Sequence, residues 1–130
     1  MSDESIPSPV PTNEHPRVVL LIEDDEAVRR SLQLLLHWRG YDVRSFASAS
    51  PVLDGDGIGE IDVLVTDYRL PDGDGIGVLR ALRRSGWSGK AILITAFPST
   101  TLTESAHATG FDAVLEKPLR QHELVGALAN

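Results

Sequence analysis

The chain of 130 residues contains no cysteine, no long apolar run and no excess of basic residues. The absence of cysteine excludes disulfides and thiolate metal sites. No apolar run approaches the roughly 20 residues of a membrane-spanning helix. The N-terminus also lacks the basic and apolar pattern of a signal peptide, so a cytoplasmic protein is expected. With 12 Lys and Arg against 19 Asp and Glu, the net charge of −7 argues against direct nucleic-acid binding by this domain.

Proline is concentrated at the start of the chain. Four of the eight prolines fall within residues 1–16, and polar residues fill much of the rest of that segment. It cannot bury enough apolar surface to offset its ordering entropy, so residues 1–16 are expected to form a flexible tail or linker. The length of residues 17–130 and the 42% hydrophobic content of the chain suit a single globular domain.

Short apolar segments, typical of strands in a buried parallel sheet, predict strands at 18–22, 61–66, 91–95 and 111–115. An alternating pattern predicts a further strand at 41–46. A helical pattern or a short helix follows each of them, and the predicted helices lie at 28–38, 50–53, 76–86, 98–109 and from 118 onward. In the first helix we expect Trp38 to close the apolar stripe, and in the third we expect Val78 at its margin. Five strand–helix repeats predict an α/β fold, a doubly wound parallel sheet with helices on both faces.

Chemically reactive side chains follow several of these strands. The third strand stops at Asp67, before the breakers Pro71 and Gly73, and the first is followed by four carboxylates at 23–26. Thr95 ends the fourth strand, and Lys117 follows the fifth. If the sheet has the flavodoxin-like order 2-1-3-4-5, strands one and three are neighbours. Asp24, Asp25 and Asp67 then converge at the edge where open α/β sheets bind ligands.

Three carboxylates in one crevice repel each other, and a divalent cation relieves that repulsion. Ligands that are all oxygen atoms suit Mg²⁺. Lys117 can supply a second positive charge and Thr95 a hydroxyl donor. These are the parts that phosphoryl transfer requires, with one carboxylate as the nucleophile. Other roles stay open: Asp24 and Asp25 also suit the N-terminus of a helix, and Asp67 alone suits a turn.

Taken together, these motifs resemble the receiver (response regulator) domain of bacterial two-component signalling over about residues 17–129. The resemblance implies that Asp67 is the phosphoacceptor. It implies Mg²⁺ held by Asp25, Asp67 and the backbone carbonyl of Arg69, with Asp24 reaching the ion through water. It also implies that Lys117 contacts the phosphoryl group and that Thr95 moves toward it. The phosphodonor would be a histidine kinase or phosphotransfer protein, and a downstream protein or output domain would bind helix four, strand five and helix five.

Two positions depart from the family pattern. Val114 stands where an aromatic residue usually precedes the lysine of strand five, and the bulky Phe97 lies two residues after Thr95. The resemblance favours a signalling switch that phosphorylates and dephosphorylates only itself. A phosphorylation-independent interaction module and a small phosphatase with an aspartate nucleophile are the alternatives. A stand-alone receiver, a part of a longer regulator and a receiver of a hybrid kinase all remain open.

Overall fold

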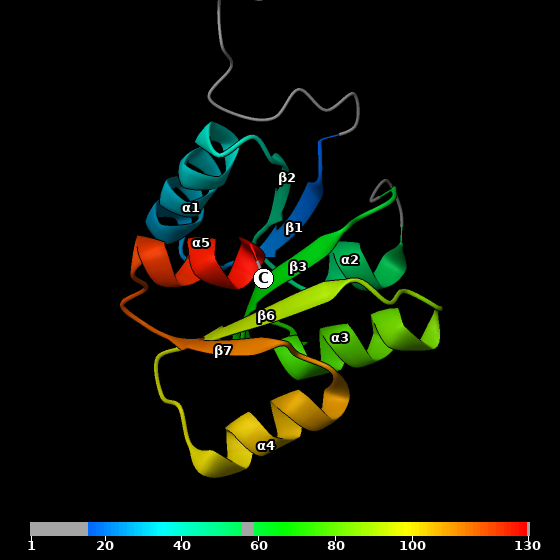
Figure 1. The fold of residues 1–130 in the computed structure, drawn as a ribbon. Helices are drawn as coiled ribbons and strands as arrows, with labels where there is room; N and C mark the ends of the chain where they lie inside the picture. The colour runs from blue at the N-terminus through cyan, green and yellow to red at the C-terminus, as the bar shows by residue number, and fades with distance from the viewer. Residues whose placement is uncertain (1–15, 56–58, 130) are drawn as a thin grey trace, which may run out of the picture.

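The computed structural model describes residues 16–55 and 59–129, so the predicted tail lies outside the described residues apart from Pro16. Five parallel strands form one twisted sheet in the order β2-β1-β3-β6-β7 (Figure 1). The strands are β1 (Val18–Ile22), β2 (Asp42–Phe46), β3 (Val63–Asp67), β6 (Lys90–Thr95) and β7 (Ala113–Glu116). This is the predicted flavodoxin-like order 2-1-3-4-5, which is therefore confirmed.

The apolar runs of β1 and β3 explain why these strands lie inside the sheet. Every residue of β3 is buried, and so is every residue of β1 after Val18. Such a strand must be covered on both faces, because its side chains alternate between the two. The parallel register pairs Leu20 with Leu64, so β1 and β3 end side by side at one edge of the sheet.

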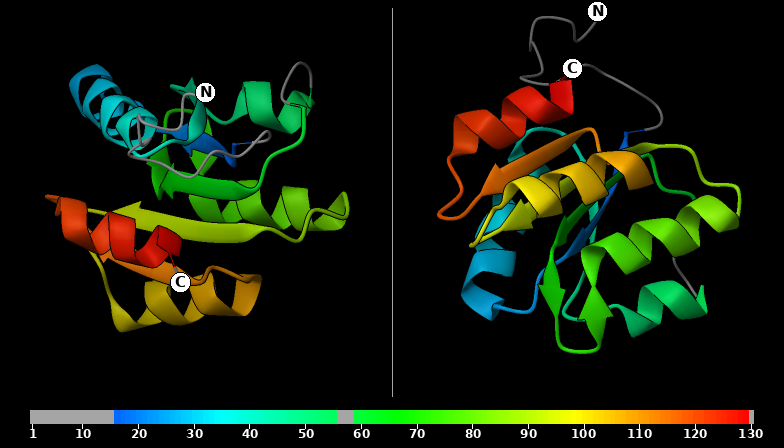
Figure 2. Two further views of the ribbon diagram at one scale, coloured as in Figure 1. Left: turned by 45° about the horizontal axis from the view of Figure 1, so that its top comes forward. Right: turned by 90° about the horizontal axis from the view of Figure 1, so that it is seen from below.

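Helices cover both faces of the sheet (Figure 2). On one face, α1 (Glu26–Trp38) and α5 (Gln121–Ala129) bury Leu32, Leu36, Leu124 and Leu128. On the other face lie α2 (Ser50–Asp54), α3 (Gly75–Arg84) and α4 (Thr100–Thr109). Their apolar side chains form a second cluster with β1, β3 and β6. The five predicted helices are all present, with boundaries displaced by a few residues.

Two predictions about helix faces are wrong. Trp38 is 75% exposed and does not close the apolar stripe of α1. It lies two residues beyond the buried Leu36, a step of roughly 200° around the helix that turns it away from the sheet. Val78 is 1% exposed and belongs to the core. The buried face of α3 is wide because α2 and α4 pack on either side of it.

A small hairpin that the sequence analysis did not predict follows β3. It pairs β4 (Arg69–Leu70) with β5 (Gly73–Asp74) in antiparallel register. Leu70 is buried in the same cluster as α2 and α3, which anchors the hairpin to the core. Among the described residues, no helix is both long enough and apolar enough to cross a membrane.

Candidate functional site

Asp67 is the last residue of β3, and only 7% of it is exposed. The N–H of the next residue, Tyr68, donates to the carbonyl of Ile94 at 2.8 Å, so the chain stays in the sheet as it passes Asp67. Gly75, at the start of α3, returns close to this point. A Cβ at Gly75 would lie 2.6 Å from the Asp67 carbonyl oxygen, so this close return of the chain requires glycine.

Glu23 is the first residue after β1, and it is 1% exposed. Its N–H donates to the carbonyl of Phe46 at 3.0 Å, and its own carbonyl accepts from Arg29 Nη1 at 2.8 Å. Its Oε2 accepts from the N–H of Asp25 at 3.1 Å. These contacts hold both the backbone and the carboxylate of Glu23 in one place beside β3.

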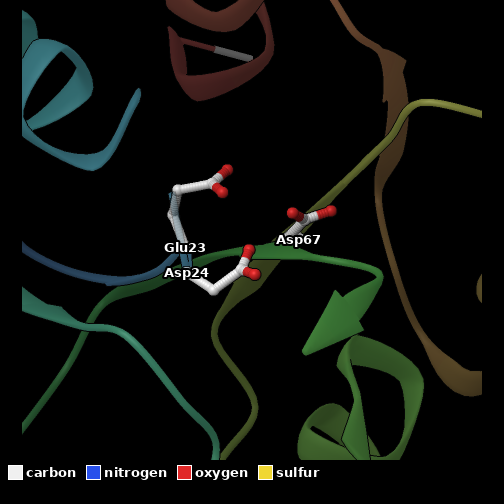
Figure 3. A group of neighbouring side chains, drawn as sticks. All are labelled: Glu23, Asp24 and Asp67. Atoms are coloured by element: carbon white, nitrogen blue, oxygen red, sulfur yellow. The ribbon is translucent and has the colours of Figure 1, made fainter. Parts of the chain in front are cut away.

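Three carboxylates meet at this edge of the sheet. Glu23, Asp24 and Asp67 each place one oxygen within 4.8 Å of the other two, and Figure 3 shows the three side chains facing a common space. Asp25 is held elsewhere, because its Oδ1 accepts from the N–H of Val28 at 3.0 Å and caps α1. Of the three predicted aspartates, the structure thus brings Asp24 and Asp67 together. Asp25 instead caps α1, which is the alternative role that its sequence position also suited.

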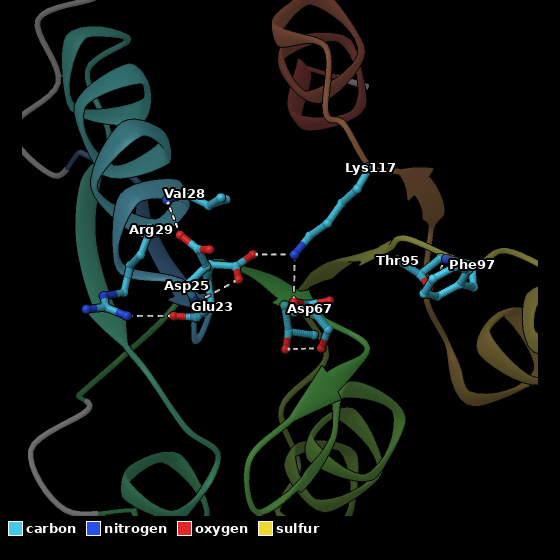
Figure 4. Close-up of polar contacts among 9 residues, drawn as sticks. Glu23, Asp25, Val28, Arg29, Asp67, Thr95, Phe97 and Lys117 are labelled. Carbon is cyan, nitrogen blue, oxygen red and sulfur yellow. Dashed lines mark hydrogen bonds and ion pairs between the residues drawn. The ribbon is translucent and has the colours of Figure 1, made fainter.

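Lys117 reaches this cluster from the end of β7 (Figure 4). Its Nζ donates to Asp67 Oδ2 at 2.8 Å and lies 3.0 Å from Glu23 Oε1. The second contact is an ion pair without hydrogen-bond geometry, so the buried Oε1 has no hydrogen-bond donor among the described residues. A single ammonium group therefore faces three carboxylates.

Burial and charge shift two pKa values in this cluster. Burial raises the pKa of the Glu23 carboxyl, and the nearby Asp67 carboxylate adds to the shift. The Lys117 ammonium and the Asp25 N–H only partly oppose it. Partial burial lowers the pKa of Lys117, but the hydrogen bond to Asp67 and the contact with Glu23 outweigh it, so the pKa is raised. The site therefore favours the protonated form of Lys117 and disfavours the ionised form of Glu23.

Thr95 ends β6, and only 3% of it is exposed. Its Oγ1 accepts from the N–H of Phe97 at 3.1 Å, which ties the hydroxyl to the loop before α4. The Phe97 side chain itself is 74% exposed. Val114, on β7, packs against the core cluster that also contains α4. Thr95 is thus joined to the loop through its hydroxyl, and Phe97 is the aromatic residue beside it.

The donor set suits a hard divalent cation. All three side chains offer carboxylate oxygens, which Mg²⁺ prefers, and the backbone carbonyl of Arg69 lies in the hairpin directly after Asp67. The buried Glu23 oxygen without a hydrogen-bond donor and the surplus of carboxylates over ammonium groups are what a cation would relieve. The residues present therefore fit Mg²⁺.

Glu23 was not predicted as a site residue, although the sequence contains a signal for it. Asp25 stands three residues before Val28, where the apolar stripe of α1 begins, and this is the spacing of a capping aspartate. Once Asp25 is assigned to the cap, the two acidic residues that remain next to β1 are Glu23 and Asp24.

Comparisons with known proteins agree with this geometry. The family model described as the response regulator receiver domain matches residues 19–129. The transcriptional regulatory protein TrcR of Mycobacterium tuberculosis is 33% identical over 111 residues, which cover 85% of this chain and 43% of TrcR. Response regulator MprA of the same species is 33% identical over 110 residues, 85% of this chain and 48% of MprA. The chain thus spans about half the length of these relatives.

Solved structures show the same fold. A receiver domain protein from Methanospirillum hungatei superposes with a TM-score of 0.81 at 24% identity, covering 88% of this chain and 92% of that one. The signal receiver domain of an HD domain-containing protein from Pseudomonas fluorescens gives 0.80 at 28% identity, covering 88% and 93%. From the carboxylate cluster, the strand order and the matched family model, we conclude that this chain belongs to the response regulator receiver domain family.

Proposed function

We propose that this domain takes a phosphoryl group from a histidine kinase or phosphotransfer protein onto Asp67. The observation that carries the proposal is the contact of Lys117 with both Asp67 and Glu23, in a pocket that holds a surplus of negative charge. An oxygen of the Asp67 carboxylate attacks phosphorus, and the new O–P bond forms as the P–N bond of phosphohistidine breaks. The electron pair stays on the imidazole nitrogen, which takes a proton from solvent.

In this proposal the acidic residues Glu23, Asp24 and Asp67, together with the Arg69 carbonyl, hold Mg²⁺. Glu23 takes the place that the sequence analysis gave to Asp25, whose carboxylate caps α1. Mg²⁺ supplies positive charge that offsets the negative charge of the carboxylates and of the incoming phosphoryl oxygens. Lys117 neutralises a further phosphoryl oxygen, and its raised pKa keeps it protonated at neutral pH.

The output of the switch would be a change in the face formed by α4, β7 and α5. Thr95 would turn its hydroxyl toward the phosphoryl group, and its bond with the Phe97 N–H would then shift the loop before α4. Because Val114 replaces the usual aromatic residue, we expect the change to run through Thr95 and the backbone. A downstream protein or an output domain would read that face, without direct contact between this domain and nucleic acid.

Acetyl phosphate with Mg²⁺ tests the proposal. We expect the intact protein to gain the mass of one phosphoryl group, and we expect that gain to be absent from Asp67→Asn and from samples with excess EDTA. Steady turnover of aryl phosphates would support the phosphatase alternative instead. No mass gain in the wild-type protein, from acetyl phosphate or from a phosphorylated kinase, would leave the interaction module as the better explanation.

A further inference from the structure

Asp72 joins two segments that are far apart in the sequence. It lies between the two strands of the β4–β5 hairpin, five residues after Asp67, the proposed phosphoacceptor. Its Oδ1 accepts from the N–H of Ala49 at 2.8 Å, and its Oδ2 accepts from the N–H of Ser50 at 2.9 Å. One exposed carboxylate thus bonds two backbone amides at the start of α2.

Helix α2 has little else to hold its N-terminus. It contains five residues, and its N-cap position is occupied by Ala49, whose side chain can accept no hydrogen bond. The first amides of a helix need acceptors, and here a residue 22 or 23 positions further along the chain supplies them. These bonds lower the pKa of Asp72, the one from Ala49 most, so the carboxylate remains ionised and accepting at neutral pH.

The same hairpin contains Arg69, whose backbone carbonyl is a Mg²⁺ ligand in the proposed function. Arg69 is the first residue of β4 and pairs with Asp74 across the hairpin. At its base, the hairpin is held by the bond from Gly75 N–H to the Tyr68 carbonyl, and Leu70 is buried. Near its tip, Asp72 supplies the bonds to α2.

We propose that Asp72 is a positioning residue that couples the start of α2 to the loop carrying the Arg69 carbonyl, and so sets the affinity of the site for Mg²⁺. The inference rests on the proposed function, since it assumes that the carboxylate cluster binds this ion. Coupling is reciprocal: if the tie to α2 favours Mg²⁺ binding, Mg²⁺ binding strengthens the tie.

The test is a calorimetric Mg²⁺ titration of the full chain and three variants. Asp72→Ala removes both acceptors, and we expect its Kd for Mg²⁺ to rise about tenfold, as for other residues that orient metal ligands. Asp72→Asn keeps one acceptor oxygen, so its Kd for Mg²⁺ should lie between the wild-type value and that of Asp72→Ala. If the carboxylate acted only through its negative charge, Asn and Ala would weaken binding equally.

Asp62→Ala is the matched control. Asp62 Oδ2 also accepts from a backbone amide, that of Val18 at 2.7 Å, but it precedes β3 at the opposite edge of the sheet. This variant loses the same charge and the same kind of bond, and we expect its Kd for Mg²⁺ to stay within about twofold of the wild-type value, because the site is distant. Equal weakening by Asp62→Ala and Asp72→Ala would overturn the inference.

Amide hydrogen exchange in the wild-type protein gives a second readout that needs no folded Ala variant. Saturating Mg²⁺ should slow exchange at Ala49 and Ser50, and unchanged exchange at both would overturn the coupling. Failure of the inference and failure of the proposed site give different results. A wild-type chain that binds no Mg²⁺ overturns both the inference and the proposed site. A chain that binds Mg²⁺ and is phosphorylated on Asp67, while Asp72→Ala matches it, overturns the inference alone.

Discussion

The two edges of the sheet use the same residue types in different ways. At the amino edge, Lys90 Nζ donates to the carbonyls of Ala127 and Leu128 at 3.0 and 3.1 Å. At the carboxyl edge, Lys117 Nζ contacts the carboxylates of Asp67 and Glu23. The first lysine binds backbone groups and fixes the end of α5. The second binds acidic side chains that outnumber it, which leaves charge for a ligand to neutralise.

The acidic residues show the same contrast. Asp62 and Asp112 at the amino edge each accept a hydrogen bond from a backbone N–H, that of Val18 and of Ala91, at 2.7 and 2.9 Å. Each of these carboxylates thus contributes to holding strands in the sheet. At the carboxyl edge, acidic side chains from two strands share one space with one ammonium group. Asp62 and Asp112 thus contribute to the fold, whereas the carboxylates at the carboxyl edge leave an excess of negative charge that a cation would neutralise.

Replacing the two lysines tests this comparison most strongly. Lys117→Met should slow phosphorylation by acetyl phosphate about 100-fold, because it removes a cation from the oxygens that gain charge. Lys90→Met should leave that rate unchanged but lower the free energy of unfolding by about 1–2 kcal/mol, because two α5 carbonyls lose a charged donor. Mass spectrometry over time and urea unfolding measure the two effects. If Lys90→Met slowed phosphorylation as much as Lys117→Met, the lysine at the amino edge would matter for the site as much as the lysine at the carboxyl edge, and the contrast between the two edges would be wrong.

The pH dependence of stability gives the next largest effect. The folded state binds a proton on Glu23 more tightly than the unfolded state does, because burial raises the pKa above its ordinary 4.5. Wild-type stability without Mg²⁺ should therefore fall, relative to Glu23→Gln, as pH rises from about 4.5 through the folded pKa. The difference should reach about 1.4 kcal/mol for each unit by which the pKa is raised.

Urea unfolding of both proteins between pH 4 and 8 measures this difference. Glu23→Gln also loses the contact with Lys117, which shifts its free energy of unfolding by a constant amount. The informative quantity is therefore the change of the stability difference with pH. Glu26→Gln, at the exposed first residue of α1, controls for the lost charge. Adding Mg²⁺ should favour the wild-type protein, because ligand binding stabilises the folded state. A stability difference that stays constant across this pH range would mean that folding does not raise the pKa of Glu23.

The fold could be predicted from the sequence because its signals are local and repeated. Apolar runs that stop at Asp67 and before Lys117 mark the strand ends, and alternation with helices predicts the parallel sheet. The predicted members of the site that do meet are Asp67, Lys117 and Asp24. Each is the first or second polar residue after an apolar run, or the last residue of the strand.

What the sequence did not reveal depends on contacts between distant segments. In the run of four acidic residues, the spacing to Val28 indicates that Asp25 caps α1, but the sequence alone does not show that Glu23 enters the site. The position of Glu23 depends on where β1 stops pairing with β2 and where α1 begins. The two bonds of Asp72 join residues that no pattern relates, so this residue reads as a simple turn former. Side-chain placement within an acidic run therefore needs the tertiary structure.

The smallest expected effect concerns Phe97, at the border of the carboxyl edge. A bulky apolar side chain two residues after Thr95 could hinder water that attacks the phosphoryl group, but the ring is 74% exposed and its backbone N–H makes the contact with Thr95. Phe97→Ala keeps that N–H and removes only the ring. We expect it to speed loss of the phosphoryl group about threefold, less than 1 kcal/mol of barrier. The decay of phosphorylated protein after removal of acetyl phosphate measures this.

Leu102 provides the matched control, because it lies nearby on α4 and is half-buried against the core. Leu102→Ala also removes apolar bulk, but from a position that packs inward, so we expect it to change stability and leave the decay rate unchanged. If Phe97→Ala decays at the wild-type rate, the ring does not shield the phosphoryl group. The role of Phe97 is then confined to its backbone bond with Thr95.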